Sequence, residues 1–524
     1  MKLYRSFATV GGLTLVSRVL GFGRDILIAS ALGSGWIADA FFVAFRFPNL
    51  FRRLFGEGAF NSAFVPLFAK RLEGEGAASA KRFAEEAMAG LAFVLILLSI
   101  ACMLAMPWLM YVIAPGFADT PAKFDLAVLL TTIAFPYLFC MSIVALMSGV
   151  LNSLGRFAES SAVSIVLNLT LMAAIVIAIL LGYSNDPRAG IALAWGVFAA
   201  GLFQLALLMW GLKRSDMWLR LVRPRLSPDV KRLVVLGIPG VIAGGITQLN
   251  ILIGTIIASL QDGAVSHLYY ADRVYELPLA IVGIAIGVVL LPDVARQLRA
   301  GNETGAIDSQ NRSLEFAMLL TVPASVALAV IPAEIVSVLF ERGAFRAADT
   351  IATSDALAIF AFGLPAFVMI KVFSPAFFAR EDTRSPMRFA VISLTFNTAA
   401  SVALFFAFRS LGIAPHLGIA LATTLGGWLN AALLYAALRR QNYFRPDQRL
   451  RRSLPLVVLA SGVMATVLFA AAELLTPWLA SGHGFAVRGS ALAVLVAAGG
   501  LSYVAAAFAL RLLTVQEIRR MIRR

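Results

Sequence analysis

The sequence predicts an all-α, polytopic membrane protein with fourteen transmembrane helices. Of its 524 residues, 60% are hydrophobic and only 14% are charged, and the mean hydropathy is +0.85. These values lie far outside the range of soluble domains. Apolar stretches of about 20 residues, the length that crosses a bilayer, recur along the whole chain. The distribution of basic residues among their connections then fixes an orientation.

The apolar stretches define the predicted spans in order. The first has no small-residue cleavage site after a short apolar core, so we expect a retained helix rather than a signal peptide. The fourteen spans are expected near residues 8–32, 36–69, 86–113, 125–150, 159–182, 189–211, 233–260, 265–294, 313–339, 351–375, 386–408, 414–437, 454–475 and 489–512.

Basic residues favour one side of these spans. With a cytoplasmic N-terminus, the inner segments hold most of the 44 Lys and Arg residues, as the positive-inside rule requires. Both termini are therefore predicted to be cytoplasmic. The net charge of +15 follows from this topology and from contact with anionic inner-leaflet lipid, so it does not indicate a nucleic-acid partner. The outer loops carry only Lys123, Arg188, Arg342, Arg346, Arg409 and Arg488.

The chain also contains an internal repeat. Gly190–Ala194 and Gly418–Ala422 both read GIALA, 228 residues apart, and Ala38-Asp39 is matched by Ala271-Asp272. Six helices, an even number, separate the copies, so both enter the membrane in the same orientation. Such parallel repeats form two lobes around an axis normal to the membrane. We expect an N-terminal lobe at 1–214, a cytoplasmic linker at 215–232, a C-terminal lobe at 233–440, and a cytoplasmic loop with two extra helices at 441–524.

Proline and glycine interrupt two spans at matching places in the repeat. The span 36–69 contains Pro48 and Pro66, and the span 265–294 contains Pro278 and Pro292. Proline removes a backbone hydrogen bond, and unwound backbone at membrane depth is tolerated only where it faces a cavity or protein. Both spans are predicted to be broken and to line the interface between the lobes, with ordinary kinks as the alternative.

Charged residues inside the spans indicate an anion-binding cavity. Each costs about 2.5–3.5 kcal/mol at the bilayer centre. Arginines outnumber acids in the first two spans, and guanidinium suits phosphate because it offers a planar fork of donors. Ion pairs that only hold helices together are the alternative. The first two spans contain Arg18, Arg24, Arg46, Arg52 and Arg53 with Asp25, Asp39 and Glu57, and the C-terminal lobe adds Asp272, Arg273, Glu276 and Lys371.

Signals for other chemistry are absent from the sequence. No glycine-rich loop ending in Gly-Lys-Ser/Thr occurs, which argues against ATP hydrolysis. Cys102 and Cys140 lie in apolar segments and are expected to be buried without a disulfide or metal. His267, His416 and His483 are expected to be solvated or interfacial at outer helix ends. We therefore expect no enzyme, cofactor or metal site.

Several motifs resemble the MurJ (MviN) lipid II flippase family. They read RVLGFGRD at 18–25, ADAF at 38–41, RFPNLFRR at 46–53, GEGAF at 56–60 and YYADR at 269–273. The resemblance covers the whole chain, and the family belongs to the multidrug/oligosaccharidyl-lipid/polysaccharide exporter superfamily. It implies a fourteen-helix protein of the bacterial inner membrane. Its substrate would be lipid II, the undecaprenyl-pyrophosphate-linked peptidoglycan precursor, moved from the inner to the outer leaflet by alternating access.

The resemblance also implies site residues. The two last helices would form a groove for the polyprenyl tail. Family members with a sodium site use acids on the seventh and eleventh spans, where this sequence offers only Gln248, Asn250 and Asn397. The headgroup cavity implied by the resemblance contains Arg18, Arg24, Asp39, Arg52, Arg53 and Arg273. To these we add Asp25 and Asn49 as predicted binding residues, and as supporting residues Arg46, Glu57, Asp272, Glu276 and Lys371.

Several questions stay open at this point. Coupling to the membrane potential or to a monovalent cation is undecided, and cell-wall synthesis enzymes are candidate partners besides membrane lipids. The alternatives are a flippase for another undecaprenyl-linked glycan, a cation or drug antiporter of the same superfamily, and a membrane-embedded glycosyltransferase. The antiporter would require an acid-dominated cavity. The glycosyltransferase would require an acid/base residue in a structured outer loop.

Overall fold

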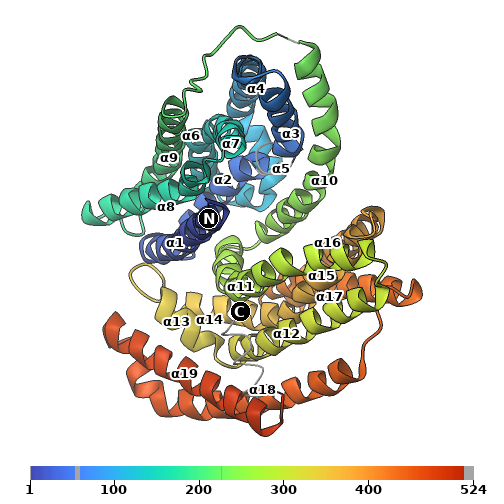
Figure 1. Cartoon of the computed structure of the whole chain (residues 1–524). Coiled ribbons are helices and arrows are strands. Elements are labelled where there is room, and N and C mark those ends of the chain that lie inside the picture. Colours follow the sequence, from blue (N-terminus) through green and yellow to red (C-terminus); the bar gives the residue numbers. More distant parts are fainter. Residues whose placement is uncertain (1, 53–58, 226, 513–524) are drawn as a thin grey trace. The chain divides into compact units, whose positions relative to one another are not determined.

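The computed structural model describes residues 2–52, 59–225 and 227–512, with side chains at 9–50, 63–225, 227–238, 248–283 and 290–512. Within that part of the chain every regular element is a helix and no strand occurs (Figure 1). Ten helical stretches of the described residues are long and apolar enough to cross a membrane. The predicted all-α fold with multiple apolar helices is confirmed. The other four predicted spans, also helical where described, are 8–32, 36–69, 233–260 and 265–294.

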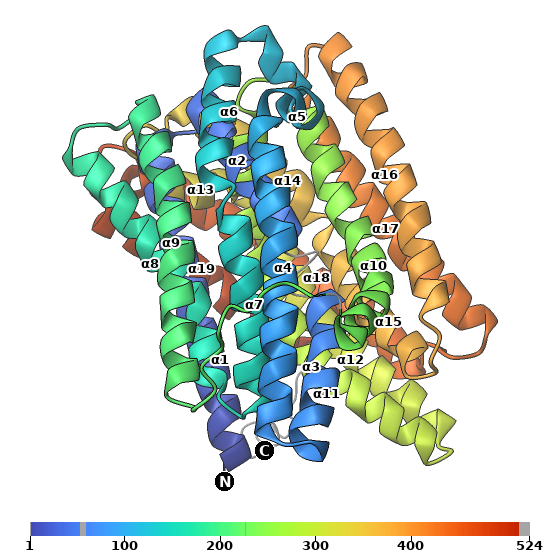
Figure 2. The same cartoon turned by 90° about the horizontal axis from the view of Figure 1, so that it is seen from above.

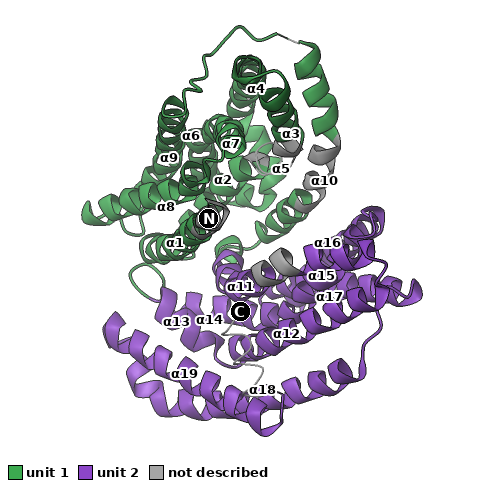
Figure 3. Ribbon diagram, viewed as in Figure 1, with its two compact units in different colours: residues 1–266, 342–345 green, residues 267–341, 346–524 purple. Residues whose placement is uncertain are grey.

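The chain divides into two compact units (Figure 3). Unit 1 comprises residues 1–266 and 342–345, and unit 2 comprises 267–341 and 346–524. This division falls near the start of one helix, whereas the division inferred from the repeat falls at the 215–232 linker. The repeat-based lobes therefore stay a prediction.

Unit 1 is built from helices that are mostly joined by short turns, with a longer connection from Lys213 to Pro228 (Figure 1). Among them, α4, α7 and α9 lie side by side (Figure 2), and α8 packs on α1 and α9. The elements are α1 (Lys2–Leu32), α2 (Trp36–Arg52), α3 (Ala59–Gly74), α4 (Ala77–Leu104), α5 (Met106–Ile113), the 3-10 helix η2 (Pro115–Asp119), α6 (Pro121–Ala134), α7 (Tyr137–Ser153), α8 (Phe157–Leu180), α9 (Pro187–Lys213) and α10 (Pro228–Ala258).

Unit 2 begins within the first turn of α11 and contains the remaining helices. Here α16 packs on α17, and α15 packs on α12 and α17. The elements are α11 (Ala264–Arg299), α12 (Glu303–Val330), α13 (Pro332–Phe340), α14 (Ala347–Ala361), α15 (Leu364–Phe378), α16 (Arg384–Ser410), α17 (His416–Arg440), α18 (Gln448–Leu479) and α19 (Phe485–Ala509).

Four predicted spans are divided into two helices each. In every case the second helix has a proline at its N-cap or first turn, where the missing N–H has no intrahelical partner to lose. The breaks recur in the same order in both units, between α4 and α5, α6 and α7, α12 and α13, and α14 and α15. Hydropathy alone did not predict them, because a break leaves the apolar length unchanged.

The two predicted broken spans have different outcomes. The span 36–69 corresponds to α2 and α3, and the residues between them lie outside the described part. The break predicted in 265–294 is wrong, since α11 is one helix of 36 residues with Pro278 and Pro292 inside it. A proline removes a single backbone hydrogen bond, and the neighbouring turns of a long helix hold it together.

The repeated GIALA word places a glycine at a close helix contact in each unit. A Cβ on Gly418 would lie 2.7 Å from the carbonyl carbon of Leu404, so α17 lies directly on the backbone of α16. A Cβ on Gly190 would lie 3.2 Å from Cδ1 of Leu130 on α6. The two copies of the repeat therefore share a helix-packing position as well as an amino-acid sequence.

The last two helices, α18 and α19, form an antiparallel hairpin that packs on other helices of unit 2 (Figure 1). Arg488 of α19 is 6% exposed. It donates from Nε to the Leu479 carbonyl (3.2 Å), from Nη1 to the Glu341 carbonyl (3.2 Å) and from Nη2 to Ser337 Oγ (2.6 Å). At the other end of the hairpin, Asp447 pairs with Arg312 of α12. Polar contacts thus anchor the hairpin at both ends.

Replacing Arg488 by Met should destabilise the protein by about 2–4 kcal/mol, because it removes the donor from one buried acceptor and two partly buried ones. The matched control is Arg409→Met, which removes an exposed arginine near the end of α16 and should cost less than about 0.5 kcal/mol. SDS-driven unfolding in mixed micelles measures both. Equal stabilities for the two variants would show that Arg488 does not anchor α19.

Candidate functional site

Arg24 lies in a buried hydrogen-bond cluster between α1 and α8. Its Nε and Nη2 donate to Asp25 Oδ1 at 3.0 and 2.7 Å, and its Nη1 donates to Asn168 Oδ1 at 3.0 Å. Asn168 in turn donates to the Ser17 carbonyl at 2.9 Å. Arg24 and Asp25 are 6% and 2% exposed, and the guanidinium lies 5.7 Å from the Phe45 ring centre. The structure therefore brings two predicted site residues together and fixes the guanidinium plane.

Helices α1 and α8 are in contact at this cluster. A Cβ on Gly21 would lie 3.4 Å from Nδ2 of Asn168, which is an ordinary van der Waals contact. The Arg24 side chain reaches across to Asn168. The RVLGFGRD sequence thus supplies the charge pair and a residue that lies beside its neutral partner.

Asp39 of α2 is fully buried and accepts four hydrogen bonds. Lys123 Nζ donates to Oδ2 at 2.8 Å, and the Gly263 backbone N–H donates to the same oxygen at 2.8 Å. The Ser266 N–H and hydroxyl donate to Oδ1 at 2.9 and 2.8 Å. A carboxylate at the N-terminus of a helix is stabilised by its unpaired N–H groups and its dipole. Asp39 therefore caps α11.

Lys123 is the cation of this network. Predicted as an outer-loop residue, it lies instead in the first turn of α6 and is 1% exposed. Its Nζ bridges Asp39 to Asp262 Oδ1, at 2.8 Å from each, and lies 4.3 Å from the centre of the Phe117 ring. A lysine this deeply buried requires such partners, because desolvating an unpaired charge is costly.

The other predicted residues of the first two spans are less enclosed. Arg46 donates from Nη1 to Thr255 Oγ1 of α10 at 3.1 Å, and Asn49 is half-buried. Arg18 is exposed and makes no hydrogen bond or ion pair with the described residues. The side chain of Arg52, and Arg53 and Glu57 entirely, lie outside the described residues.

The predicted residues of unit 2 lie on α11 and α15. Arg273 donates from Nη1 to Glu276 Oε2 at 2.9 Å and its guanidinium lies 4.7 Å from the Tyr269 ring centre, while Asp272 is half-buried. Lys371 is exposed, and no described acidic residue pairs with it. Its side chain lies against Gly283, where an added Cβ would be 2.9 Å from Lys371 Cδ.

Two histidines differ from expectation. His267 and His416 are buried rather than solvated, at 9% and 1% exposure, with ring centres 5.4 Å apart. His267 Nε2 lies 3.7 Å from Asp349 Oδ1, and His416 Nε2 lies 3.0 Å from the Ala352 carbonyl oxygen. Both histidines are buried because other helices pack against these helix ends, and sequence periodicity does not reveal such packing. The described residues include no group of His, Cys, Asp and Glu suited to a metal ion.

Sequence reasoning missed three residues of these clusters. Lys123 was predicted only as an outer basic residue, and neither Asn168 nor Ser266 was predicted as a site residue. Each contacts a predicted residue that is 84 or more positions away in the chain. The sequence contains one signal for Asn168, because Ser164 and Asn168 recur as Ser393 and Asn397 at an offset of 229 residues.

The described residues of the two units include both held and exposed cationic side chains. Arg24 presents an oriented fork, while Arg18 and Lys371 are exposed cations without an acid partner among the described residues. Intramembrane cations of this kind are suited to an anionic ligand.

A protein-family model matches most of the chain. The family model described as "Lipid II flippase MurJ" matches residues 28–487. A probable lipid II flippase MurJ of Rhizobium meliloti is 48% identical over 525 residues, covering 100% of this chain and 97% of that protein. The lipid II flippase MurJ of Burkholderia cenocepacia is 34% identical and covers 89% of each chain.

Solved structures show the same fold. A lipid II flippase MurJ in an inward closed conformation matches with a TM-score of 0.77 at 23% identity, over 96% of this chain and 98% of that one. A multidrug resistance MATE family transporter of the MOP superfamily, in an inward-facing conformation, matches with a TM-score of 0.64 at 14% identity, over 82% and 94%. At these identities the likeness concerns the fold alone.

Proposed function

Because the chain belongs to the MurJ family of lipid II flippases, we propose that its intramembrane arginines bind the pyrophosphate of lipid II. The protein moves this undecaprenyl-linked peptidoglycan precursor from the inner to the outer leaflet of the cytoplasmic membrane by alternating access, in support of peptidoglycan synthesis. It is a transporter and not an enzyme. Enzymes that polymerise the exported precursor are the partners we expect on the outer side.

The observation that carries the binding proposal is the oriented guanidinium of Arg24. Asp25 and Asn168 hold it through three hydrogen bonds, so its plane is set before a ligand arrives. Preorganised donors lose less entropy on binding. Arg18, two turns before Asp25 on α1, supplies an exposed charge without an acid partner in the described structure. Arg273 and Lys371 are the corresponding cations of unit 2, and Asn49, Arg52 and Arg53 complete the proposed set.

We also propose fourteen spans, with both termini cytoplasmic and lobes at 1–214 and 233–440. The bounds of α1 to α19 support this count, because every predicted span coincides with one helix or a pair of helices. The α18–α19 hairpin would hold the polyprenyl tail. An apolar hollow of about 290 Å³ beside α18 supports that role, since Leu450 and Leu454 line it with Phe373 and Tyr435.

The Asp39 network supports a role in alternating access. Asp39 and Lys123 belong to the proposed lobe at 1–214, whereas Gly263 and Ser266, which donate to Asp39, belong to the proposed lobe at 233–440. Rocking of one lobe against the other would therefore break these bonds in one half of the cycle. We propose that the network stabilises one of the two access states.

Reconstituted vesicles test the function directly. Lipid II should cross the bilayer faster in vesicles that contain the protein than in protein-free vesicles, and an enzyme added outside that consumes lipid II would report the transfer. An undecaprenyl-linked glycan with a different headgroup is the control for the alternative substrate. Faster transfer of that glycan than of lipid II would assign the protein to another pathway.

The membrane potential should contribute to turnover. Lipid II carries negative charge on its pyrophosphate, and an interior-negative potential favours outward movement of an anion by about 2.3 kcal/mol per elementary charge per 100 mV. We expect the flipping rate to rise with an imposed potassium-diffusion potential in the absence of sodium and proton gradients. Arg18→Gln should reduce that voltage sensitivity. A wild-type rate that is unchanged when the potential is set to zero or reversed would contradict this mechanism.

A further inference from the structure

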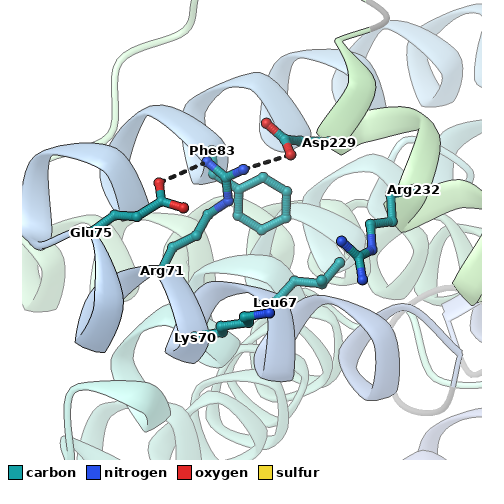
Figure 4. Close-up of a pocket in the computed structure, with 7 residues that line it drawn as sticks. All are labelled: Leu67, Lys70, Arg71, Glu75, Phe83, Asp229 and Arg232. Atoms are coloured by element: carbon teal, nitrogen blue, oxygen red, sulfur yellow. Dashed lines mark hydrogen bonds and ion pairs between the residues drawn. The ribbon is translucent and has the colours of Figure 1, made fainter.

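A basic hollow lies in unit 1 at the junction of α3, α4 and α10. It has a volume of about 100 Å³ and borders the end of the predicted cytoplasmic linker. Figure 4 shows its lining. The residues are Leu67, Lys70, Arg71, Glu75, Phe83, Asp229 and Arg232.

One of the three basic residues of the hollow is paired with its acidic residues, and the other two are not. Arg71 pairs with both acids, from Nη2 to Asp229 Oδ1 at 2.5 Å and from Nη1 to Glu75 Oε2 at 3.6 Å, and its guanidinium lies 5.2 Å from the Phe83 ring centre. Lys70 and Arg232 make no hydrogen bond or ion pair with any described residue. In Figure 4 both side chains extend toward Leu67, one from α3 and one from α10. Two converging cations thus remain uncompensated.

The surface next to these cations is apolar. Val235 and Leu236 follow Arg232 by three and four residues, so they share its face of α10, and they are 66% and 49% exposed. Leu67 precedes Lys70 by three residues on α3. A free phosphate would gain nothing from exposed aliphatic side chains, whereas the acyl chains of a lipid would cover them.

We propose that this hollow binds the phosphate group of an anionic phospholipid of the cytoplasmic leaflet. The phosphate would lie between Lys70 and Arg232, with its acyl chains along Val235 and Leu236. Arginine offers a bidentate fork to phosphate and lysine a compact charge. The Arg71–Asp229 pair would hold α3 and α10 at the spacing that the headgroup requires. This site is separate from the proposed lipid II site and does not depend on it.

Native mass spectrometry of the purified chain with phosphatidylglycerol tests the proposal. Lys70→Gln with Arg232→Gln should weaken the tightest phosphatidylglycerol adduct about 30-fold, since each of the two basic residues near a membrane surface contributes roughly 1 kcal/mol. The control is Arg223→Gln with Arg225→Gln, which removes two exposed charges from the linker next to α10. That control should leave the adduct unchanged. Equal weakening in both pairs, or in neither, would overturn the site.

Two further arms complete the test. Lys70→Arg with Arg232→Lys keeps the total charge and should retain most of the affinity, which separates lost binding from lost folding. Inorganic phosphate, added to lipid-free protein in detergent, should not raise the melting temperature, whereas phosphatidylglycerol should. Equal stabilisation by both would identify free phosphate as the ligand and overturn the lipid assignment.

Discussion

Asp39→Asn is expected to destabilise the protein by about 3–5 kcal/mol. The change leaves Lys123 buried at 1% exposure, with the largely exposed Asp262 as its remaining acid, and removal of one partner from a buried ion pair has this cost. It also weakens the N-terminal cap of α11, because an amide offers one acceptor oxygen where the carboxylate offers two. SDS-driven unfolding in mixed micelles measures the loss.

Two companion variants make this result specific. Asp262→Asn removes the other acid that contacts Lys123 and should cost less than about 1 kcal/mol, because Asp262 is 80% exposed. The double variant Asp39→Asn with Lys123→Met should lose less stability than the sum of the two single losses. Each single change leaves the charge of the other residue buried without this partner. Losses that simply add within about 0.5 kcal/mol would show that the pair is not coupled.

Arg24→Lys is expected to reduce lipid II flipping by about 100-fold or more while the protein still folds and inserts. Lysine keeps the positive charge but replaces a planar fork by a single point donor, so it cannot hold Asp25 and Asn168 and also present an oriented face to a pyrophosphate. Loss of a well-oriented charged hydrogen bond, about 1.5–3 kcal/mol each, gives an effect of this size when two are lost. Flipping rates in vesicles, normalised to the reconstituted protein, measure it.

A matched Arg→Lys change outside the proposed site distinguishes a loss of substrate binding from a loss of stability. Arg488→Lys alters another buried arginine, one that anchors α19 and lies outside the proposed site. It should lower stability at least as much as Arg24→Lys but leave the flipping rate per folded molecule near the wild-type value. Wild-type flipping by the Arg24→Lys variant at normal expression would remove Arg24 from the binding site.

Much of the fold follows from the sequence because a bilayer imposes a length on every apolar segment. The helices begin and end within several residues of most predicted spans, as α8 (Phe157–Leu180) and α9 (Pro187–Lys213) illustrate. Breaks inside spans escaped prediction, and a break was wrongly placed in α11. A proline can lie inside a continuous helix or at the start of a second helix. Only tertiary packing decides between these two outcomes.

The sequence predicted some residues of the two buried clusters but not the partners of those residues. Spacing placed Arg24 beside Asp25 and identified Asp39 as an intramembrane acid. It could not reveal that Lys123 would neutralise Asp39 or that Asn168 would complete the Arg24 cluster, because these contacts join segments 84 and 144 residues apart. Long-range partners of this kind depend on how helices pack, which local patterns do not encode.

The leaflet distribution of lipid II after depletion of the protein tests the central claim most directly. Spheroplasts from depleted cells would be treated with an enzyme that consumes only lipid II exposed on the outer leaflet, and the protected fraction would be measured. The account predicts that lipid II accumulates in the protected inner leaflet and that wild-type protein, but not Arg24→Lys, restores its exposure. An unchanged distribution in fully depleted cells, with lipid II still reaching the outer leaflet, would contradict it.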